Sequence, residues 1–223
     1  MKINALVFDM DGLLFDTEKI VQRSWNYAGE ILGYGQVGEH IYHTLGFNVV
    51  RRGEYFQEHF GKDFPVEKFN QLASDRFYEI TTTEGIPVKK GALELLEYGK
   101  AHGLKQIVAT SSRRGYAQKF LEDTGIWAYL NGGIFGDMVH HAKPDPEIYR
   151  KACEAIGELP EHCMAFEDAP AGICSCFGAG LIPVMVPDLV QPSEDILQMC
   201  YQKVNDLTEV IPILDELLGT DKK

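Results

Sequence analysis

Short apolar runs recur along the chain, and stretches with helical spacing separate them. Four of the runs are continuous rather than alternating, which is typical of strands buried on both faces of a parallel sheet. A fifth, weaker candidate lies at residues 133–135. The four stronger runs cover residues 5–8, 107–109, 163–166 and 182–186.

Between these runs, apolar side chains recur three and four positions apart, as in Tyr116, Phe120 and Leu121 or in Ile148 and Ala152. This spacing predicts helices with one apolar face. Strands that alternate with helices predict an α/β fold built on a doubly wound, mostly parallel sheet.

One region breaks the alternation. Residues 17–88 show helical patterns interrupted by glycine and proline, and no convincing buried strand. We therefore predict a small all-helical cap domain, residues 17–88, inserted after the first strand of an α/β core domain formed by residues 1–16 and 89–223.

The first helix of the inserted region is predicted over residues 17–32. Asp16 or Thr17 could cap its N-terminus through a side-chain oxygen. An apolar stripe would bury one face of this helix, and its members are Trp25, Ala28, Ile31 and Leu32.

Charge and composition narrow the possible partners. The 223 residues carry 21 Lys and Arg against 33 Asp and Glu, a net charge of −12. Such a surface repels nucleic acid and anionic lipid, so we expect neither as a partner.

The N-terminus lacks a signal-peptide pattern, and no apolar stretch approaches the ~20 residues of a membrane span. The five cysteines are an odd number, which does not suit a framework of disulfides. We expect a cytoplasmic protein with reduced thiols, a monomer by default.

Polar side chains follow three of the predicted strands. Because the carboxyl ends of parallel strands meet at one edge of the sheet, these side chains should lie close together. Clustered carboxylates repel one another unless a cation lies among them, and an oxygen-only set favours Mg²⁺. The residues are Asp9 and Asp11, Thr110 and Ser111, and Glu167 and Asp168.

Each of these features has an ordinary explanation when taken alone. Aspartates after strands commonly close turns or cap helices, and most lysines, such as Lys143, are solvated. The combination of motifs makes a functional site the better interpretation.

Four segments, in order along the whole chain, resemble the four motifs of the haloacid dehalogenase superfamily. The resemblance is strongest to the branch with a small helical cap after the first strand, which includes sugar-phosphate phosphatases and β-phosphoglucomutase. The segments are Phe8-Asp9-Met10-Asp11-Gly12-Leu13-Leu14-Phe15-Asp16-Thr17-Glu18, Thr110-Ser111-Ser112, Lys143-Pro144-Asp145-Pro146 and Phe166-Glu167-Asp168-Ala169-Pro170-Ala171-Gly172-Ile173.

The resemblance implies roles for these residues. Asp9 would be the nucleophile that forms an aspartyl-phosphate, and Asp11 would protonate the leaving oxygen and then activate water. Thr110, Ser111 and Lys143 would bind the phosphoryl oxygens.

The resemblance also implies a magnesium site. Mg²⁺ would be held by Asp9, the backbone carbonyl of Asp11, and Asp168. Glu167 would be either a further ligand or an outer partner. In the cap, Gly46, Asn48 and Arg51 are the candidate contacts for the rest of the substrate.

Several reactions compete within the resemblance. Asp11 argues against dehalogenation, whose leaving group needs no proton. β-Phosphoglucomutase uses a cap histidine at the position that is Val21 here, and the first histidine of this chain is His40. We therefore predict a Mg²⁺-dependent phosphatase acting on a small phosphorylated metabolite, such as a sugar or polyol phosphate. A β-phosphoglucomutase-like phosphomutase is the alternative, and a non-catalytic binding module is a third reading.

Overall fold

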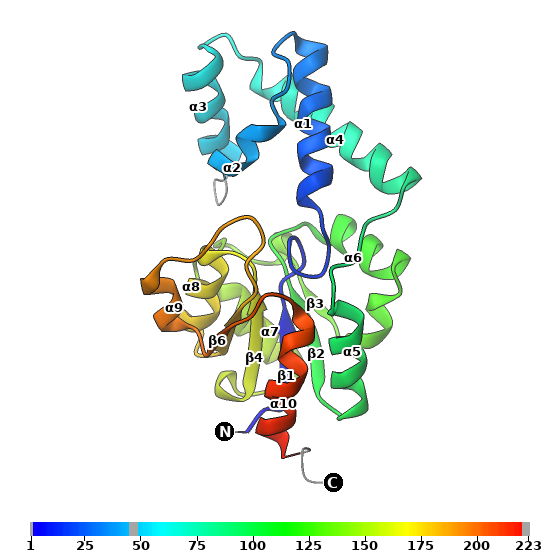
Figure 1. Ribbon diagram of the computed structural model, residues 1–223, viewed down its shortest axis with the longest axis vertical. Coiled ribbons are helices and arrows are strands. Elements are labelled where there is room, and N and C mark those ends of the chain that lie inside the picture. The colour runs from blue at the N-terminus through cyan, green and yellow to red at the C-terminus, as the bar shows by residue number, and fades with distance from the viewer. Residues whose placement is uncertain (1, 45–48, 220–223) are drawn as a thin grey trace. The chain divides into compact units, whose positions relative to one another are not determined.

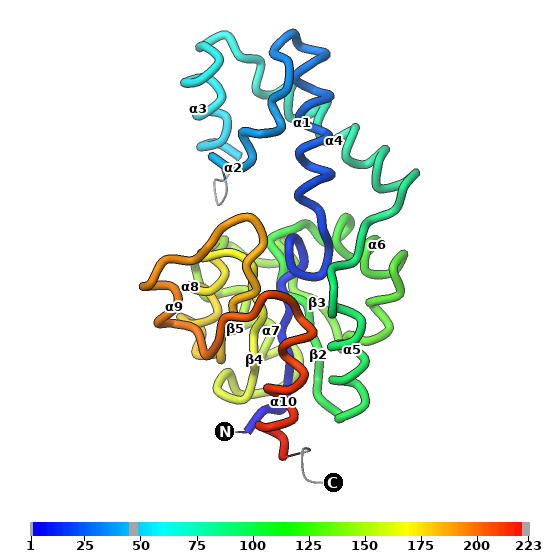
Figure 2. The backbone as a smooth tube through the Cα atoms, in the orientation of Figure 1, coloured from blue at the N-terminus to red at the C-terminus, as the bar shows by residue number. Residues whose placement is uncertain are grey.

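A computed structural model describes residues 2–44 and 49–219, and the chain divides into two compact units. One unit consists of Met1–Phe15 and Val88–Lys223, and the other is Asp16–Pro87. Figure 2 traces how the chain leaves the first unit after its first strand and returns to it before α5. The first unit is therefore assembled from two separate stretches of sequence.

The first unit contains a six-stranded sheet with strand order β3-β2-β1-β4-β5-β6, in which every pair of neighbours is parallel (Figure 1). This confirms the predicted fold class. All five apolar runs form strands, within two residues of the expected bounds. The strands are β1 (Ala5–Phe8), β2 (Lys105–Ala109), β3 (Gly133–Ile134), β4 (Cys163–Glu167), β5 (Ile182–Met185) and the unpredicted β6 (Gln202–Lys203).

The first strand lies at the centre of the sheet. Phe8 of β1 pairs with Val108 of β2 on one side and with Phe166 of β4 on the other. Because the chain builds the sheet outward from β1 in both directions, the point beside β1 is a topological switch point, where α/β proteins bind ligands. The residues that follow these three strands meet there.

Helices cover both faces of the sheet. On one face, Val7, Ile107 and Ala165 pack against Tyr149 of α7 (Glu147–Ile156) and Cys176 of α8 (Pro170–Gly178). On the other face, the Phe8 and Phe166 rings stack at 5.2 Å, and Gln106 Nε2 donates to the Leu96 carbonyl of α5. The remaining helices of this unit include α5 (Ala92–Ala101), α6 (Arg114–Asp123), α9 (Glu194–Met199) and α10 (Val210–Leu218).

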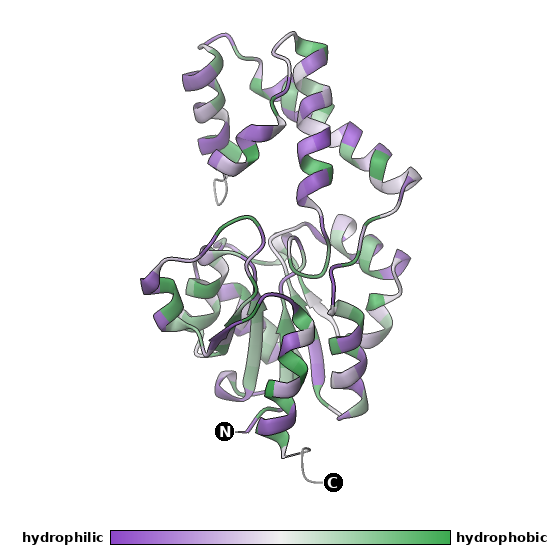
Figure 3. Ribbon diagram, in the orientation of Figure 1, coloured by the Kyte–Doolittle hydropathy of each residue, from purple (hydrophilic) through white to green (hydrophobic). Residues whose placement is uncertain are grey.

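Burial of apolar side chains between these layers is the main favourable contribution to folding. In the hydropathy colouring of Figure 3, β1 and β4 are mainly apolar, whereas the helices carry both hydrophilic and apolar positions. Among the described residues, no helix has both the length and the apolar character needed to cross a membrane.

The second unit is helical in its described residues and has an aromatic core. The Trp25 ring packs edge-on against the rings of Phe56 and Phe69, with centroid separations of 5.3 Å and 6.0 Å. The ring centroids of Tyr34 and Phe64 lie 4.8 Å apart. Its elements are α1 (Glu18–Leu32), η1 (Gly38–His40), α2 (Ile41–Thr44), α3 (Val49–Phe60) and α4 (Val66–Thr83).

Two details of the first helix differ from the prediction. Thr17 is the N-cap residue, but it already has right-handed helical backbone angles and makes no side-chain capping bond, which requires an extended backbone. Asp16 pairs with Lys19 at 3.0 Å instead of capping the helix. Ile31, expected in the buried stripe, is 58% exposed, so the stripe narrows after Ala28.

Candidate active site

A buried lysine links two carboxylates at the carboxyl edge of the sheet. Lys143 Nζ lies 2.5 Å from Asp9 Oδ1 and 2.6 Å from Glu167 Oε1, and it also donates to the Ala109 carbonyl at 3.0 Å. The side chains of Lys143 and Asp9 are each 8% exposed. Lys143 therefore links Asp9, which follows β1, to the carbonyl at the end of β2 and to Glu167 at the end of β4, so these strand ends meet at one edge of the sheet as expected.

The electrostatics of this cluster favour a charged lysine. Burial acts to lower the pKa of Lys143, but the Asp9 and Glu167 carboxylates overcome that effect and raise it. Burial raises the pKa of Glu167, against the opposing effect of the Lys143 ammonium. Burial also raises the pKa of Tyr149, whose neutral hydroxyl donates to Glu167 Oε1. Sequence reasoning missed Tyr149, because a tyrosine on a predicted helix face is first read as core.

Asp11 is held by two hydroxyl donors. Ser112 Oγ lies 2.6 Å from Asp11 Oδ2, and the Tyr116 hydroxyl lies 3.4 Å from Oδ1. Thr110 is buried, and its Oγ1 accepts the backbone N–H of Ser112 at 3.1 Å, whereas Ser111 is exposed. Ser112 belonged to the quoted motif but was not singled out from it.

Gly12 allows a fourth carboxylate to approach this turn. Its φ of +84° is in the left-handed region that glycine adopts readily. A Cβ at this position would lie only 2.3 Å from Asp168 Oδ2. Any side chain here would displace Asp168.

The carboxylates form a set that suits a hard cation. Asp9, Glu167 and Asp168 each offer an oxygen, and these oxygens lie within 4.8 Å of one another. All three donors are carboxylate oxygens, the chemistry that Mg²⁺ prefers. Glu167 Oε1 already accepts hydrogen bonds from Lys143 and Tyr149, so this carboxylate also balances the charge of the lysine.

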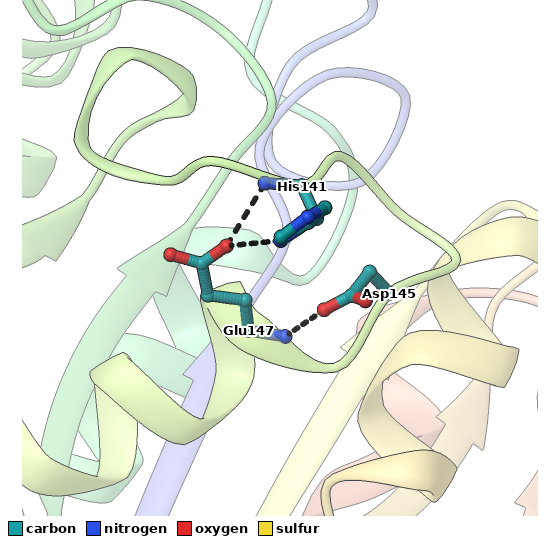
Figure 4. Close-up of side chains that lie close together, drawn as sticks. All are labelled: His141, Asp145 and Glu147. Carbon is teal, nitrogen blue, oxygen red and sulfur yellow. Dashed lines mark hydrogen bonds and ion pairs between the residues drawn. The ribbon is translucent and has the colours of Figure 1, made fainter.

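The loop that carries Lys143 is held by Glu147 (Figure 4). Glu147 Oε2 accepts the backbone N–H groups of His140 and His141, each at 2.9 Å, and contacts His141 Nδ1 at 3.2 Å. Lys151 contacts Oε1 at 2.6 Å, and Asp145 Oδ1 accepts the Glu147 N–H at 2.9 Å. Hydrogen bonds from Lys151 and from His141 lower the pKa of Glu147 to about 2.

His141, Asp145 and Glu147 lie close enough together to hold a metal ion. However, the two oxygens of Glu147 already accept hydrogen bonds from a lysine and the loop backbone. We interpret this cluster as a support for the loop.

The predicted substrate contacts of the helical unit are only partly described. Gly46 and Asn48 lie outside the described residues. Arg51 Nη1 lies 3.1 Å from Glu58 and 3.4 Å from Glu54 on its own helix. A role for Arg51 in substrate binding stays a prediction, and it would require the guanidinium to exchange these partners.

A family model for haloacid dehalogenase-like hydrolases matches residues 3–180. The chain belongs to this family. The resemblance predicted from the four motifs is confirmed, and with it the prediction of a hydrolase of the phosphatase kind.

Individual relatives agree with this assignment. The chain is 33% identical over 192 residues to YhcW of Bacillus subtilis (strain 168), covering 84% of this chain and 85% of YhcW. It is 29% identical over 181 residues to the phosphorylated carbohydrates phosphatase of Thermotoga maritima, covering 80% and 82%. The crystal structure of CbbY from Rhodobacter sphaeroides in complex with phosphate superposes with a TM-score of 0.78 at 26% identity, covering 93% and 96% of the two chains.

Proposed function

We propose that this protein is a Mg²⁺-dependent phosphatase that hydrolyses a small phosphorylated metabolite, a sugar or polyol phosphate, through an aspartyl-phosphate on Asp9. One observation carries the proposal: the Lys143 ammonium lies 2.5 Å from Asp9 Oδ1 at the switch point of the sheet. A fixed cation beside a carboxylate nucleophile is the arrangement that offsets phosphoryl charge.

The reaction would proceed in two steps. An oxygen of Asp9 attacks phosphorus, and the bond from phosphorus to the sugar oxygen breaks as Asp11 gives its proton to that oxygen. Water then attacks the phosphorus of the aspartyl-phosphate and transfers a proton to Asp11. The bond from phosphorus to the Asp9 oxygen breaks, so phosphate is released and the Asp9 carboxylate is restored. Ser112 and Tyr116 would orient Asp11 in both steps.

The phosphoryl oxygens would be bound by Lys143, Thr110 and Ser111. Asp9, the backbone carbonyl of Asp11, and Asp168 would hold Mg²⁺. When bound, this ion would neutralise charge on the phosphoryl group. The bonds of Glu167 to Lys143 and Tyr149 support an outer role for Glu167, which would balance the lysine charge.

The substrate class rests on the similarity to the phosphorylated carbohydrates phosphatase. Hydrolysis rather than phosphoryl transfer to a second sugar is supported by Val21, which cannot take part in proton transfer. We keep Gly46, Asn48 and Arg51 as the predicted contacts for the sugar part.

The test is an assay of phosphate release from a panel of sugar and polyol phosphates, with Mg²⁺ and with EDTA, in which isomerised sugar phosphate is measured in the same samples. We expect Mg²⁺-dependent phosphate release with a preferred substrate. Isomerised product with little free phosphate would instead assign a phosphomutase. No reaction with any member of the panel would favour the binding-module reading.

A further inference from the structure

Asp188 has one carboxylate oxygen in use and one without a partner. It follows β5, and its Oδ1 accepts a hydrogen bond from Lys89 Nζ at 2.6 Å. Its Oδ2 is buried and has no hydrogen-bond partner among the described residues. A buried polar atom without a partner destabilises the fold, so this oxygen needs a donor.

The oxygen without a partner lies beside Gly12, as does Asp168 of the predicted magnesium site. The point where a Cβ of Gly12 would stand is 2.3 Å from Asp168 Oδ2 and 3.5 Å from Asp188 Oδ2. The two carboxylates therefore lie on the same side of the Gly12 turn. Like charges this close to each other are stable only when a cation or hydrogen-bond donors lie nearby.

The same part of the α/β unit has room for water. A cavity of about 210 Å³ is lined by Gly12, by Lys89, which pairs with Asp188, and by Pro187, which precedes Asp188 in the chain. A cavity of this size with polar groups in its wall can hold several water molecules.

Lys89 satisfies one of the two oxygens of the carboxylate. The ammonium binds Oδ1 and leaves Oδ2 without a donor in the described part of the chain. Lys89 is itself held, because its backbone N–H donates to the Leu14 carbonyl at 2.8 Å. The segment after β1 therefore positions both Gly12 and the partner of Asp188.

We infer that Asp188 is an outer carboxylate of the cation site, whose Oδ2 accepts hydrogen bonds from water molecules held by the cation. The inference rests on the proposed function, since it assumes a hydrated divalent cation at Asp9 and Asp168. Mg²⁺ keeps several of its waters when bound to proteins, and their hydrogens need acceptors. Asp188 is thus a positioning residue and does not ligate the metal.

The test measures cation binding without any substrate. Mn²⁺ is titrated into the full chain, and the free ion is followed by electron paramagnetic resonance. In Asp188→Asn, Lys89 would still donate to the carbonyl oxygen, so the amide NH₂ group would take the place of Oδ2. The NH₂ group is a donor and cannot accept the hydrogens of the cation-bound water molecules. We expect the Kd for Mn²⁺ to rise by about 10-fold or more, as for other outer partners of metal sites.

Two matched variants serve as controls. One tests whether the loss of any nearby negative charge weakens cation binding, and the other tests whether the loss of the ion pair with Lys89 does so. Asp206→Asn removes a carboxylate that lines the same cavity and pairs with Lys90 at 2.7 Å. Lys89→Met breaks the ion pair but keeps the Asp188 carboxylate. We expect both variants to bind Mn²⁺ within about threefold of the wild type, since neither removes the acceptor. Circular dichroism in EDTA checks that all variants fold.

The outcomes are distinct. Wild-type affinity in Asp188→Asn overturns the inference, as does an equal loss in Asp206→Asn or in Lys89→Met. If the wild type itself binds no Mn²⁺ at millimolar concentration, the proposed cation dependence fails, and the inference about Asp188 is overturned with it.

Discussion

Ser112 Oγ donates a hydrogen bond of 2.6 Å to Asp11 Oδ2, although 101 residues separate the two in the chain. The Tyr116 hydroxyl reaches the other oxygen of Asp11 at 3.4 Å. If Asp11 transfers the proton, the shorter bond should matter more. We expect Ser112→Ala to lower kcat about 10-fold, which corresponds to one hydrogen bond to a charged group, with little change in KM. Tyr116→Phe is the matched comparison and should lose less. Equal losses, or a fully active Ser112→Ala, would contradict this role.

Asp9→Asn tests the nucleophile. The amide keeps the shape of the side chain but cannot form an aspartyl-phosphate, so we expect phosphate release to fall at least about 1,000-fold. We also expect weaker Mg²⁺ binding, because one proposed ligand loses its charge. The folded state should persist, which circular dichroism can verify. Turnover like that of the wild type would remove Asp9 from the mechanism.

Lys143 should contribute strongly to stability, because its removal leaves two buried carboxylates without their cation. We expect Lys143→Met to lower the free energy of unfolding by about 3 kcal/mol, measured by urea denaturation in EDTA. The double variant Lys143→Met/Glu167→Gln should recover part of that loss. Lys119→Met breaks only an exposed pair with Asp123 and should change the free energy by less than about 0.5 kcal/mol. If Lys143→Met and Lys119→Met lowered the free energy of unfolding by similar amounts, the burial of Lys143 would not be the cause of the loss.

Glu147 makes stability depend on pH. Its pKa in the folded state is about 2, below the ordinary value of 4.5, so its ionised form stabilises the fold above about pH 4.5. That contribution is lost as the pH falls from about 4.5 toward 2. We therefore expect Glu147→Gln to have a lower Tm than the wild type at pH 7, and the difference to shrink at pH 4 and below. Glu154→Gln, on an exposed position of the same helix, is the control. A difference that stays constant with pH would argue against the ionised carboxylate as the cause.

Gly172 leaves no space for a side chain beside Glu167. A Cβ there would lie about 2 Å from the Glu167 carboxylate oxygens, whereas a Cβ at Gly115 would meet nothing within 4 Å. We expect Gly172→Ala to lower the free energy of unfolding by about 1–3 kcal/mol and to reduce kcat, because Glu167 must leave Lys143. Gly115→Ala, also within a helix, should be neutral or stabilising by up to about 1 kcal/mol. Urea denaturation and phosphate release check both variants.

Most of the sheet could be predicted because its strands other than β6 contain continuous apolar runs, which are typical of strands buried on both faces. The two-residue strand β6 has exposed residues and no such run, so periodicity could not reveal it. The capping role of Thr17 was wrong because the backbone entering α1 is already helical, a property that residue type does not determine.

The candidate site, like the sheet, could be predicted from the sequence only in part. Asp9, Lys143 and Glu167 follow from motif positions and the geometry of parallel strands. Tyr149 joins the cluster from a helix, and Asp188, in a loop after β5, lies beside Gly12. Their participation depends on tertiary packing, and neither residue has a local sequence pattern that distinguishes it from an ordinary core or turn residue.

The central position of β1 has a consequence for synthesis on the ribosome. This strand is made first, yet its neighbours β2 and β4 begin only at Lys105 and Cys163. At translation rates of about 5–20 residues per second, the second neighbour emerges on the order of ten seconds later. During that interval an apolar strand that precedes Asp9, the proposed nucleophile, has no completed sheet to join. The nascent chain should therefore be most prone to aggregate, and most dependent on chaperones, before β4 emerges.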